Sequence, residues 1–95
     1  MRLEQLRRTR EQILGIADEF GVRNIRVFGS VARGPESDTS DIDLLVDLDP
    51  NRTLMDLGGL LVELERALGC PVDVSTPGML RPHVREQALR DAVPL

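Results

Sequence analysis

Acidic side chains recur at two places in the sequence where short apolar segments are typical of β-strands. Asp41 and Asp43 alternate with apolar residues in the segment DIDLLVDL, and Asp73 lies between two valines in PVDVS. Carboxylate oxygens are the ligands that Mg²⁺ prefers, and one or two carboxylates usually hold the ion together with substrate phosphates. If these strands are neighbours, the like charges would raise one another's pKa unless a cation lies among them. The three aspartates are therefore the candidate metal ligands and catalytic residues.

A Gly-Ser pair, Gly29-Ser30, lies ten residues before the first of these aspartates. Glycine lets a phosphate approach the backbone, and the amide N–H groups of a turn that begins at Ser30 would bind an anion. Arg33 would add a charge-assisted contact to the outer phosphates. Two Mg²⁺ ions about 3.5–4 Å apart that share a carboxylate are the arrangement used for in-line phosphoryl and nucleotidyl transfer. The sequence thus predicts a nucleotide site at Gly29, Ser30 and Arg33, beside two Mg²⁺ ions at the aspartates.

The pattern of apolar residues, glycines and prolines predicts the elements that position these side chains. Thr53-x-x-Asp56 is typical of a capping box, and Gly69 would end the helix that the box begins. In chain order we expect a helix over Arg2–Phe20, a strand over Ile25–Phe28, a turn and loop over 31–40, a strand over Asp41–Leu48, a helix to Leu68, a strand over Pro71–Ser75, and a helix from near Pro77, capped by Thr76, to about Asp91. The expected fold class is α/β (α+β), a small mixed β-sheet with helices packed on one face, in the order α-β-(turn)-β-α-β-α.

The lengths of the connections predict how the strands pair. Only ten residues separate the first two strands, whereas a parallel crossover needs about a dozen or more, so these strands should be antiparallel. The second and third strands are joined through a full helix and should be parallel, with a right-handed crossover. Gly29-Ser30 would then lie beside Asp41 and Asp43. Asp73 would stand level with Asp43, and all three carboxylates would point away from the core.

Composition excludes several classes of protein. The chain has 95 residues, which is expected to form one domain over 1–95, and its apolar fraction of 41% and charged fraction of 29% are ordinary for a globular protein. The net charge is −4, all twelve basic residues are arginines and only two residues are aromatic, so direct nucleic-acid binding is not expected. We find no apolar stretch long enough to cross a membrane and no secretory signal, and we expect a cytoplasmic protein. The lone Cys70 predicts neither an internal disulfide nor a zinc site.

The segment VFGSVARGPESDTSDIDLLVDL resembles the DNA polymerase beta-like nucleotidyltransferase superfamily, whose motif is Gly-Ser, about ten residues, then Asp-x-Asp. Gly29-Ser30 and Asp41-Ile42-Asp43 match this motif, and Asp73 matches the third family carboxylate. The length is similar to that of the minimal nucleotidyltransferases, which occur in prokaryotic toxin–antitoxin pairs. The resemblance implies transfer of AMP from ATP, with Mg²⁺, onto a tyrosine of a HEPN-domain ribonuclease toxin. It also implies that the chain acts as the antitoxin.

Two other functions stay open at this point. The chain could neutralise a toxin only by masking its active site, although a mask has no need for three clustered acids. It could also transfer a nucleotide to a small-molecule acceptor such as an aminoglycoside, although the acceptor-binding domain of larger superfamily members is missing. The cognate toxin is the expected partner, and the chain could also associate with a second copy of itself.

Several residues have a simpler structural interpretation. Asp41 and Asp43 could belong to a solvated strand face, an interpretation that the Gly-Ser placement and Asp73 oppose. We interpret Asp47, Asp49 and the only histidine as surface residues. Gly58-Gly59, inside a helix, indicates close packing, which could be internal or between copies. The only histidine is His83.

Overall fold

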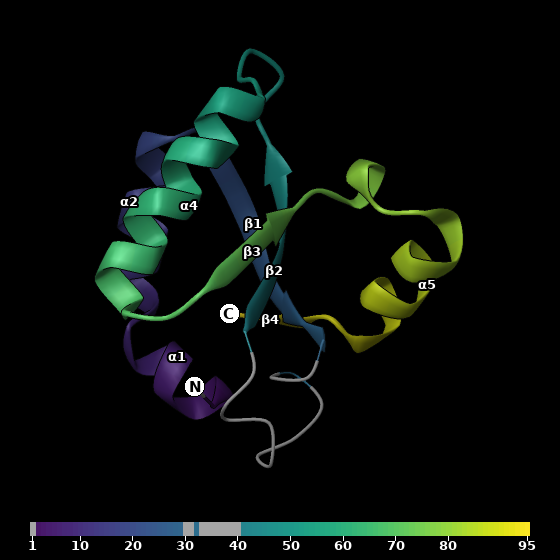
Figure 1. Cartoon of the computed structure of the whole chain (residues 1–95), viewed down its shortest axis with the longest axis horizontal. Helices are drawn as coiled ribbons and strands as arrows, with labels where there is room; N and C mark the ends of the chain where they lie inside the picture. The colour runs from purple at the N-terminus through teal and green to yellow at the C-terminus, as the bar shows by residue number, and fades with distance from the viewer. Residues whose placement is uncertain (1, 30–31, 33–40) are drawn as a thin grey trace.

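The computed structural model describes residues 2–29, 32 and 41–95 and contains a four-stranded sheet with helices on both of its faces (Figure 1). The strands lie in the order β3-β2-β1-β4. The elements, in chain order, are α1 (Leu3–Arg8), α2 (Arg10–Glu19), β1 (Val22–Phe28), β2 (Ile42–Leu48), α4 (Leu54–Leu68), β3 (Val72–Ser75), the 3₁₀ helix η2 (Pro77–Met79), α5 (Pro82–Asp91) and β4 (Val93–Pro94).

The pairing of the strands confirms the topology expected from the connection lengths. β1 and β2 are antiparallel, with Val27 opposite Leu44, and β2 and β3 are parallel, with Ile42 beside Val72. The mixed sheet and the α/β class are therefore as predicted. The short strand β4 was not predicted: it pairs antiparallel with β1 through only two residues, one of them a proline. A strand this short leaves no periodicity to detect.

Two predicted helices are each divided in the structure. The first is interrupted at Thr9, whose hydroxyl donates to the carbonyl of Leu6 at 2.8 Å and competes with the helical hydrogen bonds. The last is divided into η2 and α5, because Pro82 holds the preceding Arg81 in an extended conformation (ψ 150°) and then begins α5. The helix expected from Pro77 therefore begins five residues later than predicted, which decides where its side chains lie.

The main core lies between the sheet and the helices α1, α2 and α4. Ile42, Leu44 and Val46 of β2 are fully buried there, as is Leu64 of α4. The Phe20 ring packs against α4 at Gly59, where an added Cβ would lie 2.6 Å from the ring. The close packing predicted at Gly58-Gly59 is therefore internal at Gly59.

The last helix, α5, lies across the opposite face of the sheet, whereas the sequence placed all helices on one face (Figure 1). Leu45 of β2 and Ala88 of α5 are both buried but do not belong to the main core cluster. Leu45 is two residues from Asp43, so it points to the same face as that aspartate. An apolar residue on the carboxylate face thus needs a cover; on this face α5 contacts β1, and η2 contacts β2. None of the helices in the described part of the chain is long and apolar enough to cross a membrane.

The N-terminus of α4 carries the predicted capping box. Thr53 Oγ1 accepts the backbone N–H of Met55 at 3.2 Å, and the Asp56 carboxylate accepts the backbone N–H of Thr53 at 2.8 Å. That backbone hydrogen bond, helped by the neighbouring Arg52 guanidinium, holds the pKa of the Asp56 carboxyl below its ordinary value. Gly69 ends the helix in the left-handed conformation (φ 71°), as predicted.

Replacing Thr53 by alanine should destabilise the protein by about 1 kcal/mol, because it removes the side-chain acceptor at the N-cap of α4. The free energy of unfolding measured in urea reports this loss. Thr53→Ser keeps the hydroxyl and serves as the control, with an expected change well below that of the alanine variant. Equal stability of all three proteins would show that the cap contributes nothing.

Candidate active site

The register of the sheet brings two of the predicted carboxylates to adjacent positions. Asp43 lies opposite Phe28 of β1 on one side and beside Asp73 of β3 on the other. Neighbouring strands are about 4.8 Å apart, so the two aspartates occupy adjacent positions on the sheet. The prediction that Asp43 and Asp73 stand level is therefore confirmed.

Side-chain alternation decides which face these carboxylates occupy. Ile42 and Leu44 on either side of Asp43 are fully buried in the main core, and Val72 before Asp73 is 3% exposed in the same core. Asp43 and Asp73 therefore both point to the face that α5 partly covers. Asp41 lies just before β2 and is exposed.

Gly29, which follows β1 directly, contacts Asp43. Its backbone is left-handed (φ 72°), and an added Cβ would lie 2.4 Å from Asp43 Oδ2. Only a residue without a side chain leaves the carboxylate in its observed place. Two other predicted nucleotide-binding residues, Ser30 and Arg33, lie outside the described residues.

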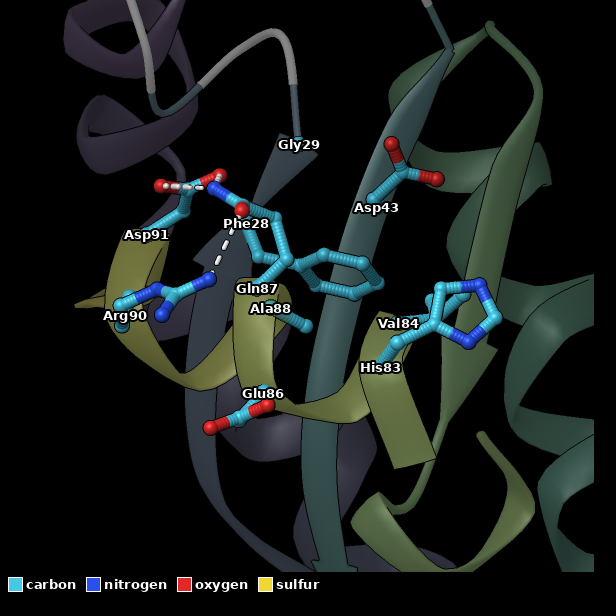
Figure 2. Close-up of a pocket in the computed structure, with 10 residues that line it drawn as sticks. All are labelled: Phe28, Gly29, Asp43, His83, Val84, Glu86, Gln87, Ala88, Arg90 and Asp91. Atoms are coloured by element: carbon cyan, nitrogen blue, oxygen red, sulfur yellow. Dashed lines mark hydrogen bonds between the residues drawn. The ribbon is translucent and has the colours of Figure 1, made fainter. Parts of the chain in front are cut away.

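A cavity of about 560 Å³ opens between α5 and the ends of β1 and β2. Figure 2 shows Asp43 and Gly29 at one end of this space, the Phe28 ring at its centre, and side chains of α5 along its wall. The α5 residues that line it include His83, Val84, Gln87, Ala88 and Asp91, which recur at three- and four-residue spacing. His83 is exposed, as interpreted from the sequence, but it borders this cavity.

Hydrogen bonds fix the wall that α5 contributes. The Arg85 guanidinium donates to the carbonyls of Pro77 at 2.7 Å and Leu80 at 3.0 Å, which ties α5 to the preceding turn. On the cavity side, Arg90 donates to the Gln87 side-chain oxygen at 3.0 Å, and the Gln87 amide donates to Asp91 at 3.2 Å. The amide of Gln87 is thus engaged both as a donor and as an acceptor.

Two further acids, at and just after the C-terminal end of β2, have basic partners. Asp47 accepts from the Arg26 guanidinium at 3.0 Å and from Asn24 at 2.9 Å. Asp49 forms an ion pair with Arg23. Both are half-exposed, which agrees with their interpretation as surface residues and distinguishes them from the candidate site.

The donor set fits Mg²⁺ only when substrate oxygens complete it. Over residues 2–29, 32 and 41–95, no group of three or more His, Cys, Asp or Glu side chains is placed to hold a metal ion. The structure places Asp43 and Asp73 in register but does not gather all three predicted aspartates into one ligand group. One or two carboxylates with substrate phosphates are nevertheless the usual Mg²⁺ environment. The left-handed Gly29, whose Cβ would fill the space beside Asp43 Oδ2, leaves room for such a ligand.

Comparison with known proteins finds a matching family model and similar sequences. The sequence model described as a nucleotidyltransferase domain matches residues 9–95. A candidate protein adenylyltransferase of Methanocaldococcus jannaschii, MJ0435, is 38% identical over 93 residues, which cover 98% of this chain and 97% of the relative. Protein adenylyltransferase MntA of Thermococcus cleftensis is 37% identical over 78 residues, which cover 82% of this chain and 79% of MntA.

Solved structures share the fold. The structure of a candidate minimal nucleotidyltransferase has 47% sequence identity and a TM-score of 0.84, and the match covers 100% of this chain and 97% of that one. A toxin–antitoxin structure with AMP-PNP has a TM-score of 0.72 at 21% identity, over 88% of this chain and 69% of that chain. At this lower identity the similarity concerns the fold alone.

Proposed function

The chain belongs to the nucleotidyltransferase domain family, and on that premise we propose that it transfers AMP from ATP to a tyrosine hydroxyl of a HEPN-type ribonuclease toxin and so acts as its antitoxin. The proposed catalytic activity rests on one observation: Asp43 is in register with Asp73 and lies beside Gly29. The choice of a protein acceptor is supported by relatives named as protein adenylyltransferases. The choice of a toxin is supported by the fold shared with an antitoxin complex.

The proposed roles of Gly29, Asp43 and Asp73 follow from their positions, and those of Ser30, Arg33 and Asp41 follow from the sequence motif. Gly29, Ser30 and Arg33 bind the triphosphate, and Asp41, Asp43 and Asp73 are the ligands for Mg²⁺. When bound, Mg²⁺ would neutralise phosphate charge and lower the pKa of the acceptor hydroxyl. The acceptor oxygen forms a bond to the α-phosphorus, the bond from that phosphorus to the bridging oxygen breaks, and pyrophosphate leaves. Asp73, exposed at the edge of this group, helps to accept the hydroxyl proton.

Incubation with ATP labelled at the α-phosphate, Mg²⁺ and the protein encoded by the neighbouring gene should label that protein. Chelation of Mg²⁺ by EDTA should lower the transfer at least about a hundredfold, because the carboxylates and phosphates would otherwise repel one another. Mass spectrometry of the labelled protein should find the added AMP on tyrosine. Absence of transfer in the presence of Mg²⁺, or transfer that EDTA leaves unchanged, would contradict the proposal.

A further inference from the structure

We infer that the cavity between α5 and the sheet binds the nucleoside part of the donor nucleotide. This inference rests on the proposed function, because it takes the phosphates to bind at Gly29 and Asp43. The cavity begins at these two residues and continues along α5 (Figure 2). A substrate whose α-phosphate lies at Asp43 can therefore place its ribose and base directly in this space.

The size of the cavity suits a small molecule. Its volume of about 560 Å³ lies within the range of about 300–1,000 Å³ found for ligand pockets. Its described walls come from α5 and from the ends of β1 and β2, which also carry Gly29 and Asp43. The acceptor must reach the α-phosphorus from the side opposite the leaving pyrophosphate.

The lining suits an uncharged, flat group rather than a phosphate. Phe28 is an aromatic residue in the cavity, whereas Phe20 packs against Gly59 on the other face of the sheet. Val84 and Ala88 extend the apolar surface beside the Phe28 ring. Every nucleobase has a flat π-face, so any of the bases can stack on such a ring.

Charge places the phosphates at the Gly29 end. Among the described residues that line the cavity, α5 contributes the carboxylates of Glu86 and Asp91 and one guanidinium, that of Arg90, and Arg90 and Asp91 are both engaged with Gln87. A polyphosphate would be repelled along the α5 wall, whereas a nucleobase would not. The triphosphate therefore extends away from α5 and the base extends towards it.

Val84→Phe tests this assignment because it fills the cavity from the α5 side, where Val84 is 40% exposed. Leu89→Phe is the matched control, since Leu89 lies on the same helix, is 47% exposed and does not line the cavity. Calorimetry with Mg²⁺ would measure binding of ATP and of methyl triphosphate, which has the same phosphates without a nucleoside. Val84→Phe should weaken ATP binding at least about tenfold, which is about 1.4 kcal/mol, and should leave methyl triphosphate within threefold. Leu89→Phe should change neither ligand by more than twofold.

Three outcomes would overturn the inference, and they differ from failure of the proposed function. The first is that the wild-type protein binds ATP no more tightly than methyl triphosphate. The second is that Val84→Phe weakens ATP binding no more than Leu89→Phe does. The third is that Val84→Phe raises the KM for the acceptor while ATP affinity is unchanged, which would make the cavity an acceptor site. If the wild-type protein bound neither ligand, the proposed function itself would fail.

Discussion

Replacement of Asp43 by asparagine should lower nucleotidyl transfer at least about a hundredfold without unfolding the protein. Asp43 is on the central strand pair, in register with Asp73 and in contact with Gly29, so it lies where nucleotide and metal would meet. Asparagine keeps the size of the side chain but removes the negative charge. Loss of one group that stabilises developing charge in a transition state typically costs a factor of about 10²–10³. Transfer of label from ATP to the partner protein measures the effect.

Asp47→Asn is the control for removal of a charge from the same strand and face. Asp47 accepts from Arg26 and Asn24 instead of contacting Gly29. Its ion pair with Arg26 is partly buried on the arginine side and contributes on the order of 1 kcal/mol to stability. We expect its transfer rate to stay within about threefold of wild type. Equal transfer by Asp43→Asn and wild type would contradict the catalytic role. Rescue of toxin-expressing cells by the Asp41→Ala/Asp43→Ala protein at normal expression would favour neutralisation by masking.

The strand pairing could be predicted because it depends on features local in the sequence. The ten residues before Asp41 are too few for a parallel crossover, and the capping box at Thr53 fixes where α4 begins. The level placement of Asp43 and Asp73 was predicted because each is the third residue of its predicted strand and the two strands are parallel, and the structure confirms it. Because side chains alternate along a strand, both carboxylates point to the face opposite the main core.

The cavity could not be predicted because it depends on the position of α5. The sequence predicts one continuous helix from Pro77. In the structure α5 begins only at Pro82, after an extended Arg81. The signal was present in two residues: Leu45 is an apolar residue on the carboxylate face and required a cover, and Ala88 is a small residue that is buried on α5. Neither residue belongs to a motif, so only three-dimensional packing identifies Phe28 and Val84 as cavity residues.

Replacement of Gly29 by alanine should displace the Asp43 carboxylate, and comparison with Gly69→Ala should show how much of any effect comes from lost stability alone. Gly29 and Gly69 have nearly the same left-handed backbone, with φ of 72° and 71°. A Cβ at Gly69 would meet nothing within 4 Å, whereas a Cβ at Gly29 would lie 2.4 Å from Asp43 Oδ2. Alanine in this conformation costs about 1–2 kcal/mol at either position, so the two variants form a matched pair.

The two variants should therefore lose similar stability and differ in activity. The Asp43 carboxylate is the end of a rotatable side chain and can move away from the new Cβ at little additional cost in stability, but it then leaves its catalytic position. A displacement of about 1 Å can lower a rate about a hundredfold, so we expect Gly29→Ala to lose at least tenfold in transfer and Gly69→Ala less than twofold. Urea unfolding and label transfer, measured on both proteins, check the two halves of the prediction. If Gly29→Ala and Gly69→Ala kept equal activity, the contact between Gly29 and Asp43 would have no part in catalysis.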